Sequence, residues 1–307
     1  MKDRILDILR AEKGVVSGAR LGSELNTSRV SIWKHIRQLQ DMGYVITATP
    51  KGYRLDEEPD VLFPWAFGRR QDRIHFFEET DSTMSVARDL ARNGSPEFTV
   101  VIAEKQLRGR GRLDRQWYSA AGGLYFTLIL RPQLPPNRVF RINFAAALAL
   151  VNTLKELFDI EAKVKWPNDV LIDNKKVAGM LSEFEADSDR LDYVNLGFGI
   201  NVNNDIRPFN KTAISLKQLL GRPVARKEVL LVFLKHLEAL LDERRLDKIV
   251  NLWKQCTATL GRRVRIVTRR AEFIGRAVDI DPEGALILAQ DDGGSMAVHY
   301  GDCFHEE

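Results

Sequence analysis

The sequence of 307 residues is poor in cysteine and has no long apolar run. Its two cysteines, Cys256 and Cys303, show no metal-ligand spacing, so we expect two reduced thiols rather than a metal site or a disulfide. Reduced thiols are usual in a cytoplasmic protein. No apolar run approaches the roughly 20 residues that cross a bilayer. The start of the chain places Asp3, Arg4 and Asp7 among apolar residues, which argues against a signal peptide, and we expect no membrane association.

The sequence also lacks a large net charge, since the formal value is only +4. Residues 1–55 hold ten Lys and Arg against five Asp and Glu, whereas the remainder holds 36 against 37. A basic N-terminal segment predicts a nucleic-acid-binding module. The overall content of 44% hydrophobic and 29% charged residues is ordinary for folded domains and excludes a mainly disordered chain.

The first 55 residues carry the pattern of a winged helix-turn-helix. Apolar spacing and turn residues predict three helices and then two strands, over 1–13, 18–25, 29–42, 44–49 and 53–55. The third helix has a core stripe of Ile32, Ile36 and Leu39, and Ser28 is a suitable N-cap for it. In such modules the third helix enters the major groove of DNA and the wing contacts phosphate.

A polar stripe on the same helix supplies candidate DNA contacts. We expect operator DNA to bind through residues 1–55, with these residues in contact: Arg29, Ser31, Lys34, His35, Gln38 and, on the wing, Lys51. A solvated surface helix, or a winged helix that binds protein, remains open as an alternative. The acidic, proline-containing stretch 56–60 predicts a linker.

The next 200 residues alternate strands and helices joined mostly by short turns. This order predicts an α+β domain with a mixed or antiparallel sheet. Short apolar runs after residue 260 predict a small β-barrel.

The loop at 105–115, KQLRGRGRLDR, has the strongest chemical signal. It holds five cations and two glycines against one acid, Asp114. Glycines let a backbone approach a ligand closely, and Arg side chains offer forked donors for phosphate or carboxylate oxygens. The loop is neither a dinucleotide-binding fingerprint nor a Walker A loop, because Asp114 stands at the third glycine position and no Gly-Lys-Ser/Thr follows. The loop therefore predicts an anion-binding cradle, with a mobile basic surface loop as the alternative.

The loop and four further blocks, in order, resemble biotin protein ligases. The blocks are Asp81-Ser82-Thr83, Gly109-Arg110-Gly111-Arg112 with Arg115 and Trp117, Lys165-Trp166-Pro167-Asn168-Asp169, Lys176 to Glu183, and Gly197-Phe198-Gly199-Ile200-Asn201. With its winged helix, the chain is similar to the bifunctional branch, the biotin operon repressor type. The resemblance implies three domains: a winged helix-turn-helix (1–58), a class II synthetase-like biotin/ATP domain with a mixed sheet (62–257) and an SH3-like barrel (258–307).

The resemblance also implies the reaction. The family uses ATP and Mg²⁺ to convert biotin to biotinyl-5′-AMP, and then transfers biotin to a lysine of the biotin carboxyl carrier protein of acetyl-CoA carboxylase. It further implies a cytoplasmic repressor that responds to biotin and forms a ligand-promoted homodimer through the central sheet.

By the same resemblance, site residues fall into three groups, and none is assigned as a metal ligand. The catalytic group comprises Arg110, Arg112, Lys165, Asp169 and Lys176. The biotin-binding group comprises Ser82, Thr83, Met84, Gln106, Arg110, Gly111, Arg112 and Lys176. The ATP- or adenylate-binding group comprises Arg115, Asn168 and Asn201.

Simpler roles remain open for several of these residues. Ser82 or Thr83 would also cap the following helix, and Lys176 would also suit an exposed turn. Trp117 would pack over the closed loop or serve as a structural residue. Two positions depart from many relatives, which have glycine at position 114 and asparagine at position 84, where this chain has Asp114 and Met84.

These departures leave room for one alternative function, a ligand-sensing transcription regulator with weak or lost ligase activity. A lipoate-type ligase, and a ligase whose winged helix no longer binds DNA, are further alternatives.

Overall fold

The computed structural model describes residues 1–12 and 14–306. Their contacts form two compact units, Met1–Asp72 and Arg73–Glu307. Within the described ranges, no helix combines the length and the apolar character needed to cross a membrane.

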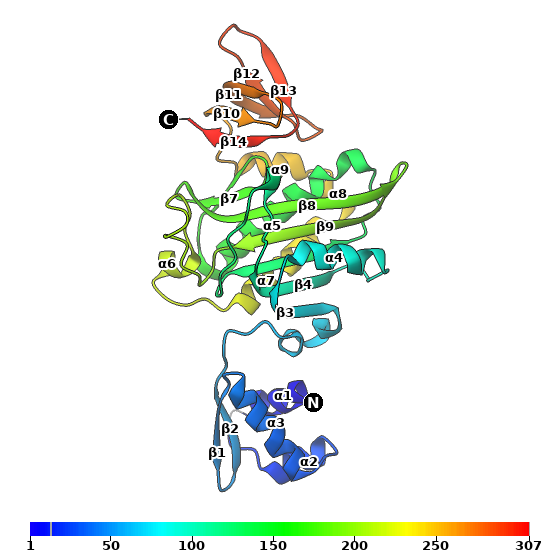
Figure 1. Ribbon diagram of the computed structural model, residues 1–307, viewed down its shortest axis with the longest axis vertical. Helices are drawn as coiled ribbons and strands as arrows, with labels where there is room; N and C mark the ends of the chain where they lie inside the picture. Colours follow the sequence, from blue (N-terminus) through cyan, green and yellow to red (C-terminus); the bar gives the residue numbers. More distant parts are fainter. Residues whose placement is uncertain (13, 307) are drawn as a thin grey trace. The chain divides into compact units, whose positions relative to one another are not determined.

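The first unit has three helices followed by a two-stranded antiparallel wing (Figure 1). The elements are α1 (Lys2–Glu12), α2 (Gly18–Glu24), α3 (Arg29–Asp41), β1 (Val45–Thr49) and β2 (Gly52–Glu57). The helix α3 begins where its sequence indicates, because Ser28 Oγ accepts a hydrogen bond from the Ser31 N–H at 3.1 Å. This order confirms the helix-turn-helix expectation.

The core of the first unit is formed by apolar side chains from all three helices. Ile32, Ile36 and Leu39 of α3 are buried there, as the spacing predicts. Val61 and Trp65 also pack against this core. The compact unit therefore extends past the acidic stretch 56–60 that the sequence indicates as a linker.

The second unit is built on a seven-stranded sheet of order β3-β4-β5-β9-β8-β7-β6. The strands are β3 (Ile74–Thr80), β4 (Thr99–Gln106), β5 (Leu124–Leu130), β6 (Lys163–Lys165), β7 (Asp169–Ile172), β8 (Lys175–Asp187) and β9 (Arg190–Ile200). The pair β3–β4 is parallel and the other pairs are antiparallel, which confirms the mixed sheet.

Helices cover both faces of this sheet, so the central strand β5 is buried along its whole length. On one face α4 (Thr83–Arg92) contacts β4, β5 and β9, while α5 (Phe140–Phe158) and α7 (Arg226–Leu240) lie behind the sheet (Figure 1). Large and small residues therefore alternate along β9. Phe198 stacks with Phe126 and contacts Phe233 of α7 on one face, whereas Gly197 and Gly199 lie on the face that α4 covers. The remaining helices are α6 (Leu216–Leu220), α8 (Glu243–Leu246), α9 (Ile249–Gln255) and the 3₁₀ turns η1 (Pro64–Arg73), η2 (Arg112–Asp114) and η3 (Pro136–Arg138).

The C-terminal residues form a five-stranded antiparallel sheet of order β13-β12-β11-β10-β14. Its strands are β10 (Arg263–Val267), β11 (Glu272–Ile280), β12 (Leu286–Ala289), β13 (Ser295–Val298) and β14 (Asp302–His305). Trp166, which is buried, donates from Nε1 to the Gly284 carbonyl at 3.2 Å and ties this sheet to the central one. The boundary between catalytic and C-terminal domains at 257/258 stays a prediction.

Candidate active site and nucleic-acid interface

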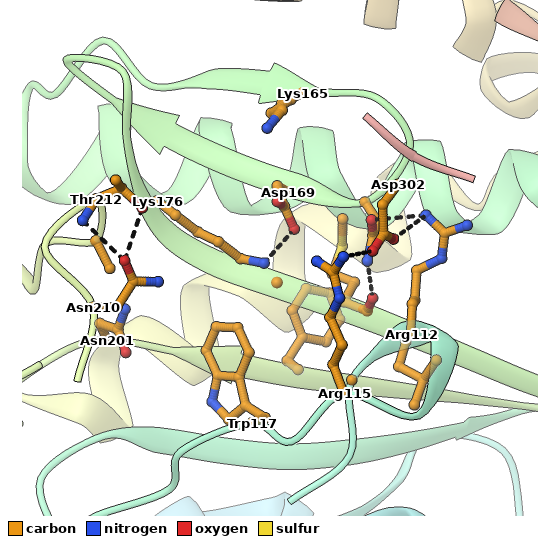
Figure 2. Close-up of a pocket in the computed structure, with 18 of the residues that line it drawn as sticks. Arg112, Arg115, Trp117, Lys165, Asp169, Lys176, Asn201, Asn210, Thr212 and Asp302 are labelled. Atoms are coloured by element: carbon orange, nitrogen blue, oxygen red, sulfur yellow. Dashed lines mark hydrogen bonds and ion pairs between the residues drawn. The ribbon is translucent and has the colours of Figure 1, made fainter. Parts of the chain in front are cut away.

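One cavity of about 950 Å³ lies on the face of the central sheet that carries Gly197 and Gly199 (Figure 2). Its walls come from the loop 110–118, the β6–β8 hairpins, the end of β9 and the strand β14 of the C-terminal sheet. All thirteen residues that the sequence assigns to ligand binding or catalysis line it: Ser82, Thr83, Met84, Gln106, Arg110, Gly111, Arg112, Arg115, Lys165, Asn168, Asp169, Lys176 and Asn201.

The floor of the cavity requires glycine. A Cβ atom at Gly199 would lie 2.2 Å from Cε2 of Trp117, and one at Gly197 would lie 2.6 Å from Sδ of Met84. Trp117 thus lies directly against the sheet, and Lys176 Nζ is 5.1 Å from its ring centroid. Two side chains that the sequence leaves uncertain, Met84 and Trp117, therefore form part of the apolar lining.

Beneath α4 the cavity is lined by polar side chains that are hydrogen-bonded to one another or to Ser119. Gln106 Oε1 accepts hydrogen bonds from the Thr83 N–H at 2.9 Å and the Thr83 hydroxyl at 3.1 Å, and Gln106 Nε2 donates to Ser119 Oγ at 2.9 Å. Ser82 stands at the N-cap of α4 but makes no side-chain cap bond. Its buried hydroxyl has no hydrogen-bond partner among the described residues, so it remains available to a ligand.

Another part of the cavity, which we call the cationic end, holds Arg112, Arg115 and Lys176. Lys176 Nζ forms an ion pair with Asp169 Oδ1 at 2.7 Å (Figure 2). Arg112 donates from Nη1 to the Asn168 side-chain oxygen and to the Gly301 carbonyl, both at 3.2 Å. Burial lowers the pKa of Arg112 from its ordinary value, although Asp302 and Asp169 counteract this effect. The guanidinium stays charged at neutral pH because its ordinary pKa is so high.

Other cations of the site have different surroundings. Arg110 Nη2 pairs with Glu183 Oε1 at 2.6 Å, and Glu183 is also held by Arg88. Lys165 points toward the cavity from β6 and has no ion pair with any described residue (Figure 2).

A residue missed by the sequence analysis joins the cationic end. Asp302, from the start of β14, pairs with Arg115 at 2.8 Å and lies 4.0 Å from Arg112. Its neighbours Cys303 and His305 also line the cavity. Burial raises the pKa of the Cys303 thiol to about 12 and lowers the pKa of His305 to about 4, so both are neutral at pH 7.

Asp114, which stands where many relatives have glycine, forms an ion pair outside the cavity. Asp114 pairs with Arg269 at 2.5 Å, and both side chains are exposed. Asp114 is not among the lining residues, so its carboxylate is directed to the C-terminal sheet and away from the ligand space.

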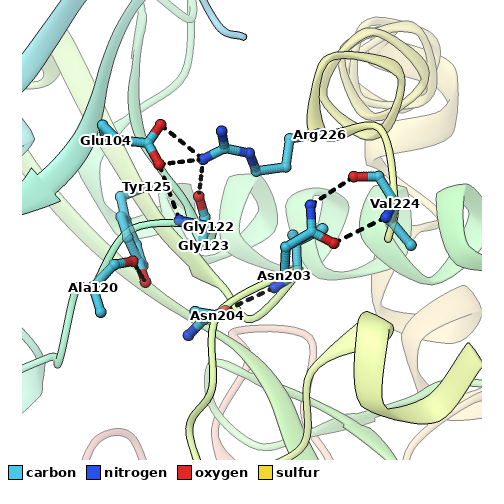
Figure 3. Close-up of polar contacts among 10 residues, drawn as sticks. Glu104, Ala120, Gly122, Gly123, Tyr125, Asn203, Asn204, Val224 and Arg226 are labelled. Atoms are coloured by element: carbon cyan, nitrogen blue, oxygen red, sulfur yellow. Dashed lines mark hydrogen bonds and ion pairs between the residues drawn. The ribbon is translucent and has the colours of Figure 1, made fainter. Parts of the chain in front are cut away.

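A buried network supports the turn that carries Asn201 (Figure 3). Arg226, at the start of α7, donates to both Glu104 carboxylate oxygens at 3.0 and 2.9 Å and to the Gly123 carbonyl at 2.9 Å. Glu104 accepts in turn from the Gly122 N–H. Asn203 then bonds the Gly122 carbonyl through its N–H and pairs through its side chain with both backbone groups of Val224. Sequence analysis did not identify this network.

In the first unit, the residues assigned to DNA do not share one exposed face. Arg29, Lys34, Gln38 and Lys51 are exposed. Ser31 is half-buried, and its N–H is bonded to Ser28. His35 is also half-buried, and its Nδ1 is enclosed without a hydrogen-bond partner among the described residues.

Three family models match the chain in sequence. They are an HTH domain over residues 2–54, the Biotin/lipoate A/B protein ligase family over 76–201 and the Biotin protein ligase C terminal domain over 259–306.

Individual relatives agree with these matches. Bifunctional ligase/repressor BirA of Bacillus subtilis is 35% identical over 95% of this chain and 94% of its own length. Biotin–[acetyl-CoA-carboxylase] ligase of Paracoccus denitrificans is 35% identical over 68% of this chain and 91% of its own. The structure of biotin protein ligase from Aquifex aeolicus in complex with biotin and ATP superposes with a TM-score of 0.65 at 29% identity, covering 76% of this chain and 98% of that chain.

The fold and the cavity define a protein of the biotin/lipoate ligase class. The chain belongs to the biotin protein ligase family, in the branch whose members are bifunctional ligase/repressors.

Proposed function

We propose that this protein activates biotin with ATP to biotinyl-5′-AMP, transfers biotin to a lysine of a biotin carboxyl carrier protein, and represses transcription in response to biotin. The observation that carries the ligase activity is that one cavity brings together the Ser82 hydroxyl, which has no hydrogen-bond partner among the described residues, a floor of glycines, and the cations Arg112, Arg115 and Lys176. That layout suits a ligand with a small polar head, an apolar body and an anionic tail.

Biotin would bind with its ureido ring toward α4. The Ser82 hydroxyl offers a free donor and acceptor there, while Gln106 holds Thr83 in place. Met84 and the sheet glycines supply apolar contact for the bicyclic ring.

In the first step a biotin carboxylate oxygen attacks the α-phosphorus of ATP. A new oxygen–phosphorus bond forms, and the bond to the pyrophosphate leaving group breaks. Negative charge builds on phosphate oxygens near Arg112, Arg115 and Lys176, whose fixed positive charges stabilise it. Each tenfold in rate requires about 1.4 kcal/mol of such stabilisation, so the protein acts mainly through position and electrostatics.

In the second step the carrier lysine attacks the acyl carbon of the mixed anhydride, and AMP leaves. The incoming amine must lose a proton. Asp169 lies beside Lys176 at 2.7 Å and is the carboxylate best placed to orient or deprotonate that amine.

Magnesium would enter with the nucleotide. The described residues contain no group of three or more His, Cys, Asp or Glu side chains able to hold a metal. Mg²⁺ is commonly bound through substrate phosphates and one or two carboxylates, and Asp169 fits that limited role.

The ligase activity is tested by incubating the full chain with ATP, magnesium, biotin and a carrier domain, followed by a streptavidin blot. A carrier whose acceptor lysine is replaced by arginine is the control. Absence of labelled carrier with folded protein would refute the ligase and favour the ligand-sensing regulator.

The repressor activity is tested by gel shift with DNA from upstream of biotin-synthesis genes, with and without biotin and ATP. Binding should weaken steeply as the salt concentration rises, because the Lys and Arg side chains of the protein release counterions from the DNA phosphates when they bind. Sedimentation under the same conditions tests ligand-promoted dimerisation.

A further inference from the structure

Two large apolar side chains on α3 lie outside the hydrophobic core of their unit. Val30 is 63% exposed and Trp33 is 50% exposed. They stand three residues apart, so they lie on one face of the helix and in its N-terminal half. The core of the unit is complete without them, since Ile32, Ile36 and Leu39 fill it from the other side.

Cations surround this apolar pair. Arg29, Lys34, Arg37 and Lys51 are exposed and form no ion pair with any described residue. Other arginines of the same unit are neutralised: Arg10 by Glu58, Arg20 by Glu12 and Glu24, and Arg54 by Asp56. Arg4 and Arg69 are also exposed and form no ion pair with a described residue, but they lie on other elements, whereas these four cations lie on α3 and the wing, as do Val30 and Trp33 on α3.

The surface is also hollowed. A groove of about 460 Å³ runs between α3 and the wing, and Trp33, Arg37, Lys51 and Tyr53 line it. The Arg37 guanidinium lies 5.6 Å from the Trp33 ring centroid, which keeps the indole on the edge of the groove. A partner of this surface must therefore offer apolar groups to Val30 and Trp33 and anionic groups to the cations beside them.

The major groove of DNA has this chemistry wherever thymine methyl groups lie between two phosphate backbones. We propose that α3 reads its operator through apolar contact of Val30 and Trp33 with thymine methyl groups, while Arg29, Lys34, Arg37 and Lys51 hold the flanking phosphates. The half-site must then place A·T pairs beneath these two side chains. Ser31 and His35, both half-buried, contribute little to base recognition. This inference rests on the repressor function proposed above.

The experiment removes only the methyl group. The full chain, with biotin and ATP, first selects a binding site from a pool of random duplexes. Each thymine of the selected site is then replaced by deoxyuridine, which differs from thymine only in lacking the C5 methyl. The wild-type protein should lose about 5- to 10-fold in affinity at one or two positions per half-site.

Substitutions connect the lost methyl to the side chain. Trp33→Ala should bind the unmodified site more weakly than the wild type. When the thymine that Trp33 contacts is replaced by deoxyuridine, the affinity of Trp33→Ala should fall by less than about 2-fold further. Trp33→Phe should restore part of the methyl sensitivity. Val278→Ala, which truncates an equally exposed apolar side chain on the C-terminal sheet, should behave as wild type. Carrier biotinylation should be unchanged in all variants.

The outcomes distinguish this inference from the repressor function. Equal deoxyuridine losses in wild type and Trp33→Ala, or no loss in wild type, would overturn the methyl contact and leave DNA binding intact. Normal DNA binding by Trp33→Ala with weakened self-association would assign the surface to a protein partner. Selection of no duplex at all would overturn the repressor function together with this inference.

Discussion

Asp302 on the C-terminal sheet and Arg115 on the ligand loop form an ion pair of 2.8 Å at the edge of the cavity. The Asp302 side chain is only 13% exposed, whereas the Arg115 side chain is 57% exposed, so the carboxylate is enclosed and the guanidinium reaches it from the solvent side. Through this ion pair, and through the Gly301 carbonyl that accepts from Arg112, β14 orients both arginines that face the phosphate end. The C-terminal sheet thus forms part of the active site.

Replacing Asp302 by alanine should therefore raise the KM for ATP about tenfold, the loss expected from one charge-assisted contact. The KM for biotin should change little, because the ureido end lies beneath α4. Steady-state kinetics with each substrate varied will check this. The control is Asp291→Ala, which removes an exposed partner of Arg263. Tighter ATP binding in Asp302→Ala would mean that the carboxylate competes with phosphate instead.

The cations themselves can be tested with a neighbouring control. Arg112→Ala and Lys176→Ala should each reduce biotinyl-5′-AMP formation by about 100-fold or more, because each removes charge stabilisation from the transition state. Lys175→Ala is the matched control, since Lys175 precedes Lys176 in β8 but does not line the cavity. Pyrophosphate release in a single turnover separates this step from transfer to the carrier. Wild-type rates in either active-site variant would refute its assignment.

Local sequence predicted the helix-turn-helix elements and a mixed or antiparallel central sheet, and the family resemblance supplied the thirteen site residues that line the cavity. Gly-rich and Arg-rich blocks stand at strand ends, where the sheet brings them together, and the alternation of β9 follows from its sequence. Asp302 could not be found in this way. It lies in a four-residue strand without clear alternation of burial, and its partner Arg115 is distant in the chain. The two residues meet because the C-terminal sheet packs against the loop that carries Arg115.

The residues assigned to DNA contact on α3 show a second limit of prediction from the sequence. Ser31 and His35 are half-buried in the structure, whereas Val30, Trp33 and Arg37 are exposed. Helical spacing alone does not predict this difference, because Trp33 and Arg37 stand as far around the helix from Ile32 and Ile36, about 100°, as Ser31 and His35 do. The sequence analysis chooses Ser31 and His35 for their polarity and leaves Trp33, which is 50% exposed, unassigned.

The network around Arg226 should contribute strongly to stability. Arg226→Ala leaves Glu104 without its partner in a partly buried site and should lower the free energy of unfolding by about 3 kcal/mol. Arg207→Ala removes an exposed ion pair and should change it by less than about 1 kcal/mol. Urea denaturation will measure both. Equal effects would show that the network adds no more than a surface pair.

His305 should make the fold sensitive to acid. Burial lowers its pKa from the ordinary 6.5 to about 4 in the folded chain. Between these values the unfolded chain binds a proton that the folded chain does not, so stability falls as the pH drops from about 6.5 to about 4. Below that window both states are protonated and the loss is complete. His305→Asn should flatten this slope in urea denaturation at several pH values, whereas His299→Asn, at an exposed histidine, should keep it. An unchanged slope in His305→Asn would assign the acid sensitivity to other groups.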